Sequence, residues 1–114
     1  KSGERAVHER RTRIGLRRVE LDRERDARGE GFCLRVNGHA IFCKGVNWVP
    51  VRITYGSVTP EMVAHRLRLY ADMGLNILRV WGGFTLEAKC FYDLCDQLGL
   101  MIWQEFPLSS SRIV

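Results

Sequence analysis

The sequence lacks any apolar run that approaches the roughly 20 residues of a membrane-spanning helix, although 46% of its 114 residues are hydrophobic. It also lacks a CxxC pair, and its 4 cysteines and 3 histidines are scattered along the chain. Zinc sites usually use closely spaced pairs of ligands, so we expect no metal and no cofactor. Cys90 and Cys95 fit the apolar pattern of one helix, which is compatible with a reducing compartment and slightly favours a cytoplasmic location.

No part of the sequence is uniformly cationic, although the formal net charge is +5 and many arginines precede Gly31. Acidic residues are interleaved with these arginines, among them Glu20, Asp22, Glu24 and Asp26. Such alternation is typical of a solvated surface of mixed charge rather than of a patch that binds nucleic acid or a membrane. We therefore expect neither as a partner, and keep an arginine-rich nucleic-acid-binding module only as an alternative function.

The first third of the chain indicates short antiparallel strands. Residues 12–22 are expected to form a strand, and the charged, glycine-containing residues 23–31 a linker or turn. Asn37-Gly38 then separates two apolar runs within residues 32–43. Both central positions of a type I′ turn need a positive φ, which Asn and Gly tolerate, so this dipeptide predicts a hairpin.

After this hairpin, strand and helix patterns alternate. Each strand-plus-helix unit takes roughly 25–30 residues, and the strands are apolar throughout, as parallel strands covered by helices should be. Thr59-Pro60 signals a helix start and Gly74 a helix end. We therefore expect an α/β fold that is unfinished at the end of the chain. The predicted elements are a strand at 44–50, a helix at 60–73, a strand at 76–81, a helix at 86–98 and a strand at 100–103.

The strand at 76–81 suggests a site. A period of two places Ile77, Arg79 and Trp81 on one face and Leu78 and Val80 on the other. A partly buried guanidinium requires an anion or several acceptors. Arg79 therefore either pairs with a carboxylate on the neighbouring strand end or orients a catalytic carboxylate supplied from elsewhere.

Ligands of α/β folds bind at the carboxyl ends of the parallel strands, and all 3 tryptophans of the chain fall there. These indoles either fill the core or stack on a sugar ring, whose hydroxyls would bond to the neighbouring amide, guanidinium and carboxylate groups. We favour the sugar site. Glu105 is the neighbouring carboxylate in the first alternative for Arg79, and we favour the second, in which Arg79 orients a catalytic carboxylate supplied from elsewhere. The candidate substrate-binding residues are Asn47, Trp48, Trp81, Gly82 and Glu105.

Several stretches together resemble a known family. "VNGHAIFCKGVNWVP", "ADMGLNILRVWGG" and "FYDLCDQLGLMIWQEF" resemble the start of the catalytic barrel of glycoside hydrolase family 2, and most closely its β-mannosidase-like branch. "IGLRRVELDR" is similar to the last strand of the immunoglobulin-like domain that precedes the barrel. The resemblance implies that residues 1–28 are the end of that β-sandwich and a linker, and that residues 29–114 begin a (β/α)8 TIM barrel.

The resemblance also implies retaining hydrolysis by two carboxylates about 5 Å apart. The acid/base of the family lies in an Asn-Glu pair, which does not occur here, so we expect no catalytic carboxylate in this chain. Arg79 matches the arginine that supports the nucleophile, Trp81 matches a residue of the sugar subsite, and Asn47-Trp48 lies on the adjacent wall. Phe84 stands where β-mannosidases usually have a third glycine, so the implied substrate is a β-mannoside or a related β-glycoside.

Two further expectations follow. A non-catalytic carbohydrate-binding or scaffold protein on a degenerate barrel is the alternative to a hydrolase, and an Asn-Glu pair further along the gene would decide between them. A slice of a barrel leaves strand edges unpaired, so a homo-oligomer that covers these edges is possible.

Overall fold

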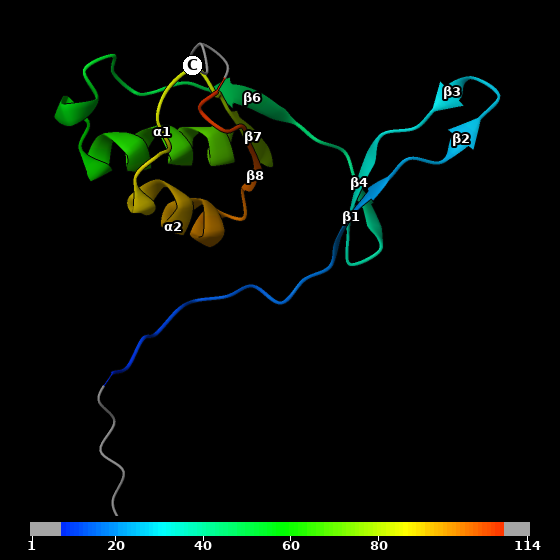
Figure 1. Ribbon diagram of the computed structural model, residues 1–114, viewed down its shortest axis with the longest axis horizontal. Helices are drawn as coiled ribbons and strands as arrows, with labels where there is room; N and C mark the ends of the chain where they lie inside the picture. Colours follow the sequence, from blue (N-terminus) through cyan, green and yellow to red (C-terminus); the bar gives the residue numbers. More distant parts are fainter. Residues whose placement is uncertain (1–7, 109–114) are drawn as a thin grey trace, which may run out of the picture. The chain divides into compact units, whose positions relative to one another are not determined.

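The computed structural model describes residues 8–108. The contacts within the chain define two compact units that are divided between Phe42 and Cys43 (Figure 1). None of the helices in this described range is long and apolar enough to span a bilayer. The domain boundary expected between residues 28 and 29 stays a prediction. In the structure, the Asn37-Gly38 hairpin that follows residue 28 belongs to the first unit.

The first unit contains a three-stranded antiparallel sheet in the order β1-β4-β5. The predicted Asn37-Gly38 hairpin is confirmed, because these residues join β4 and β5 with φ angles of 51° and 80°. The bounds of the sheet strands are Val19–Asp22 for β1, Cys33–Val36 for β4 and His39–Ile41 for β5.

One prediction for this unit was wrong and another was incomplete. The strand expected at 12–22 is confined to β1, since the residues before Val19 pair with no strand in the described chain and leave Leu16 91% exposed. The linker or turn expected at 23–31 does contain a turn, which joins β2 (Arg25–Asp26) and β3 (Gly29–Glu30) in a two-stranded hairpin that was not predicted. Its turn is stabilised by Asp26, whose Oδ1 accepts hydrogen bonds from the amides of Arg28 and Gly29.

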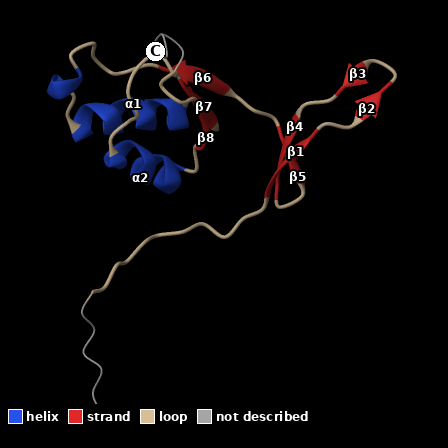
Figure 2. Cartoon of the chain, in the orientation of Figure 1, coloured by secondary structure: helices blue, strands red, loops and turns tan. Residues whose placement is uncertain are grey.

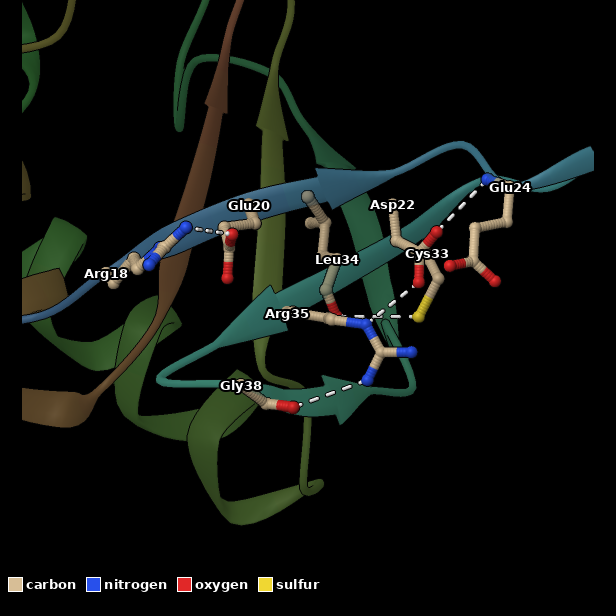
Figure 3. Close-up of polar contacts among 8 residues, drawn as sticks. All are labelled: Arg18, Glu20, Asp22, Glu24, Cys33, Leu34, Arg35 and Gly38. Carbon is tan, nitrogen blue, oxygen red and sulfur yellow. Dashed lines mark hydrogen bonds and ion pairs between the residues drawn. The ribbon is translucent and has the colours of Figure 1, made fainter.

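One face of the first sheet carries paired charges (Figure 3). Arg35 Nε donates to Asp22 Oδ2 at 2.9 Å, and its Nη1 donates to the Gly38 carbonyl at 3.3 Å. The hydrogen bond from Arg35, together with the one from the Glu24 amide, lowers the pKa of Asp22. Asp22 therefore neutralises the charge of Arg35 locally.

The second unit is a parallel sheet with helices on one face (Figure 2). The predicted strand and helix alternation is confirmed, and the strand order is β6-β7-β8. The core lies between helices and sheet, where Leu67, Leu78 and Phe91 are fully buried. The elements are β6 (Gly45–Trp48), the 3-10 helix η1 (Tyr55–Ser57), α1 (Pro60–Asp72), β7 (Ile77–Val80), α2 (Lys89–Leu98) and β8 (Met101–Gln104).

Helix ends in this unit follow the predicted signals. Thr59 caps α1, because its side chain accepts a hydrogen bond from the Met62 amide. Gly74 and Gly99 follow the helices with φ angles of 73° and 71°, a conformation that favours glycine. The second helix begins at Lys89 rather than at residue 86, because Ala88 is still extended. Residues 81–88 thus form a longer loop than the sequence indicated.

Candidate functional site

The candidate site lies on the face of the parallel sheet away from the helices, at the carboxyl ends of its strands. Arg79 stands in register with Asn47 of β6 and with Trp103 of β8. Residues in register on parallel strands project to the same face. On β7 the alternate residues Leu78 and Val80 are buried in the core, so the predicted division of this strand into two faces is confirmed.

The Arg79 guanidinium binds one side chain from β6 and one from the residue that follows β8. Its Nε donates to Glu105 Oε1 at 2.8 Å, and its Nη1 donates to Asn47 Oδ1 at 2.9 Å. Its Nη2 also contacts Glu105 Oε1 and completes an ion pair. Of the two alternatives raised for this arginine, the pairing with the neighbouring strand end is therefore present. The three bonds fix the plane of the guanidinium, which an ammonium group could not reproduce.

Glu105 is held as an ionised carboxylate. The hydrogen bond from Arg79 is the largest cause that lowers its pKa, and the bond from the Gly82 amide to Oε2, 3.2 Å long, is the second. Both partners favour the charged form. A carboxylate with a lowered pKa is a hydrogen-bond acceptor at neutral pH and is unsuited to donate a proton as a general acid.

Gly82 is buried at the point where the chain leaves β7, and the site leaves no room for a side chain there. A Cβ atom on this residue would lie 2.5 Å from the Phe106 carbonyl oxygen and 3.1 Å from Glu105 Cβ. The absence of a side chain allows the Gly82 amide to approach the Glu105 carboxylate. The neighbouring Gly83 lies under the Trp81 indole, since a Cβ there would come within 2.0 Å of ring atom Cζ2.

Two of the three predicted aromatic residues border this arrangement. Trp81 directly follows β7 and is 40% exposed, and Trp103, in register with Arg79, is 49% exposed. Trp48 does not border the site, so the prediction that it lies on the sugar-facing wall was wrong. It is in register with Val80 and Gln104 and is only 1% exposed, so its indole lies in the core under the helices.

Sequence reasoning missed two residues behind the site. The hydroxyl of Tyr92 in α2 donates a hydrogen bond of 2.7 Å to Gln104 Oε1. Gln104 Nε2 in turn donates to the Glu105 carbonyl at 2.6 Å. The polar Gln104 directly after the apolar run at 100–103 was the available signal, but nothing in the sequence indicated its partner on the helix.

The arrangement can bind hydroxyl groups. A guanidinium, an amide and a carboxylate converge between two part-exposed indoles, which suits a ligand with hydroxyls around a flat ring. Within residues 8–108 no cluster of three or more His, Cys, Asp or Glu could hold a metal ion.

Comparison with known proteins gives a consistent result. No family model matches the chain. It is 42% identical over 100 residues to the β-mannosidase of Bos taurus and 38% identical over 100 residues to β-mannosidase B of Aspergillus clavatus. These matches cover 86% and 88% of the chain but only 11% and 12% of the two relatives.

Solved structures agree with these relatives. A β-D-mannosidase from Dictyoglomus thermophilum superposes with a TM-score of 0.81 at 40% identity, over 82% of this chain and 12% of that one. A β-glucuronidase from Parabacteroides merdae superposes with a TM-score of 0.65 at 25% identity, over 84% of this chain and 11% of that one. The chain is therefore similar to a segment of glycoside hydrolases that makes up only 11–12% of the length of these relatives. Among them, the segment is β-mannosidase-like.

Proposed function

We propose that the protein to which this segment belongs is a retaining hydrolase of β-mannosides or related β-glycosides, of glycoside hydrolase family 2. In this proposal β6, β7 and β8 are the first three strands of a (β/α)8 barrel, and β1 is the last strand of an immunoglobulin-like domain. The observation that carries the proposal is the bonding of Arg79 to Glu105 and Asn47 at the carboxyl ends of three parallel strands, in a chain similar to β-mannosidases.

We assign the two catalytic carboxylates to parts of the protein outside this segment, because the sequence contains no Asn-Glu pair. Arg79 supports the nucleophile. Three of its five N–H groups are occupied by Glu105 and Asn47, and within residues 8–108 no other partner is recorded for the remaining two. These two N–H groups are the ones that would bind the nucleophilic carboxylate or a substrate hydroxyl.

The substrate-binding role falls to Trp81, Asn47, Glu105 and the backbone at Gly82. The Trp81 indole, held against Gly83, offers a flat face to the apolar side of a sugar. The ionised Glu105 can accept hydrogen bonds from sugar hydroxyls with the lone pairs that Arg79 and Gly82 leave open. Since Trp48 is buried, it is not part of the surface that contacts the sugar.

The experiment is a screen of the full-length protein on nitrophenyl glycosides, with the β-mannoside first and the β-glucuronide and β-glucoside beside it. We expect hydrolysis of the β-mannoside with retention of configuration, which NMR of the first-formed product reports. Hydrolysis of a different β-glycoside would correct the substrate and keep the reaction. A lack of activity on all of them, in a protein without an Asn-Glu pair, would replace the proposal with the non-catalytic carbohydrate-binding alternative.

A further inference from the structure

Trp48 lies at the junction of two loops that leave the parallel sheet, residues 49–59 after β6 and residues 81–88 after β7. Its ring is packed in the core, 4.8 Å from the ring centroid of Phe91 and 6.1 Å from that of Tyr70. The buried indole has one polar atom, Nε1, which donates to Glu87 Oε1 at 2.9 Å. Burial of an N–H group is costly without a partner, so this bond links Glu87 firmly to the core.

The same tryptophan also binds the other end of the loop at 81–88. The Trp48 carbonyl accepts a hydrogen bond of 3.1 Å from the Trp81 amide. Trp48 is thus bonded to the first residue of the loop through its backbone and to the seventh through its side chain. Ring and carbonyl belong to one rigid residue at the end of β6, so the two ends of the loop are held at a fixed separation.

A second contact supports the middle of this loop. The Tyr55 hydroxyl donates to the Leu86 carbonyl at 3.3 Å, and the Tyr55 ring lies 5.8 Å from that of Phe84. Both contacts come from the loop after β6. Residues 81–88 therefore have few options for movement although they contain no helix or strand, and their conformation decides where the Trp81 indole rests against Gly83.

We propose that Trp48 and Glu87 are positioning residues, whose hydrogen bond fixes the loop at 81–88 and thereby holds the Trp81 indole in the orientation that receives the sugar ring. This inference rests on the proposed function and goes beyond it, because it assigns a role to two residues that do not touch the substrate. It also gives a reason for an indole, rather than another large apolar side chain, at the end of β6.

The test uses the full-length enzyme and the variants Glu87→Gln and Glu87→Leu, which have similar size but differ in the acceptor oxygen. We expect Glu87→Leu to lower kcat/KM on the nitrophenyl β-mannoside at least tenfold, while Glu87→Gln stays within threefold of the wild type. Lys89→Met is the matched control, because this substitution removes the positive charge of an exposed pair with Asp93 near the same loop.

The decisive measurement repeats Glu87→Leu in a Trp81→Ala background. If Glu87 acts through Trp81, Glu87→Leu has less than a twofold effect in this background, because changes at residues that are coupled through a shared backbone shift are not additive. An equal loss in both backgrounds would show a general structural role and overturn the inference. If Glu87→Leu does not fold, Trp48→Phe removes the same N–H group and keeps a smaller aromatic ring in the core, and it is held to the same outcomes.

A readout independent of activity separates this inference from the proposed function. The Trp48 indole N–H signal in NMR should exchange slowly with solvent in the wild type and in Glu87→Gln, and rapidly in Glu87→Leu. A protein that shows this exchange pattern but hydrolyses none of the glycosides would refute the proposed function and still support the fixed loop. Fast exchange in the wild type would refute the loop anchor whatever the activity.

Discussion

Substitution of Gly82 by alanine tests the site at its tightest point. The new Cβ atom would lie 2.5 Å from the Phe106 carbonyl oxygen, whereas real Cβ atoms essentially never approach a heavy atom within 3.0 Å. The chain at residues 105–106 must therefore move by at least about 0.5 Å. Because the bond from the Gly82 amide to Glu105 is already 3.2 Å long, such a movement breaks it and shifts Glu105 relative to Arg79.

The expected cost appears in activity more than in stability. A misplacement on the order of 1 Å near a catalytic centre costs about 100-fold, so we expect kcat/KM of the full-length enzyme on the β-mannoside to fall by about tenfold to 100-fold. The overpacking itself costs about 1–3 kcal/mol, which a thermal melt would show as a Tm lower by a few degrees.

Gly56→Ala is the matched control, because nothing lies within 4 Å of a Cβ at that position. It should leave both kcat/KM and Tm close to the wild type. Steady-state kinetics and melts of both variants, prepared side by side, make the comparison. Wild-type kcat/KM in Gly82→Ala would refute the reasoning, since it would mean that the placement of Glu105 does not matter for the reaction.

Further predictions concern charge, thiol chemistry and assembly. Arg79→Ala should lower kcat by orders of magnitude while KM changes less, and Arg79→Lys should not restore it; an unchanged kcat would contradict the assigned role. The pKa of Glu105 is lowered in the folded protein, so its ionised carboxylate stabilises the fold at pH values above the ordinary pKa of 4.5. This stabilisation is lost as the pH falls through the folded-state pKa. The Tm of Glu105→Gln should therefore change less with acid pH than the Tm of the wild type. Burial raises the pKa of the Cys95 thiol to about 12, so at pH 8 iodoacetamide should label the exposed Cys43 well before Cys95, which peptide mapping checks. The 114-residue chain expressed alone should aggregate or oligomerise through the open edges of β6 and β8, and a monodisperse monomer in light scattering would argue against this.

Much of the second unit was predictable because its signals are local. Thr59-Pro60 caps a helix, Gly99 ends one with a left-handed φ, and the apolar residues between them leave few alternatives to buried helices and strands. The pairing of Arg79 with Glu105 was the less favoured of the two alternatives that the sequence raised, although a similar local signal was available for it. Both residues lie at the ends of neighbouring parallel strands, and an arginine on a covered sheet needs an anion.

The first unit was harder to predict because its strands are short and charged. Alternating residues at 12–18 have the pattern of a strand, but a strand forms only where another can pair with it, and β4 extends only along Val19–Asp22. The hairpin of β2 and β3 has just two residue pairs. Its turn depends on one Asp26 side chain that bonds to two amides, and a charged, glycine-containing sequence fits a linker equally well.

The error at Trp48 has a different origin, and its cause applies to parallel sheets in general. Adjacent residues of a strand point to opposite faces, so Asn47 and Trp48 could not both lie on the face of the candidate site. The register shows that Asn47 lies on this face, because it aligns with Arg79 while Trp48 aligns with the buried Val80. The strand period, applied to residues 45–48 as it was to residues 76–81, would have separated the two. A tryptophan at a strand end is therefore evidence of a site only after its face has been fixed by a neighbour whose direction is known.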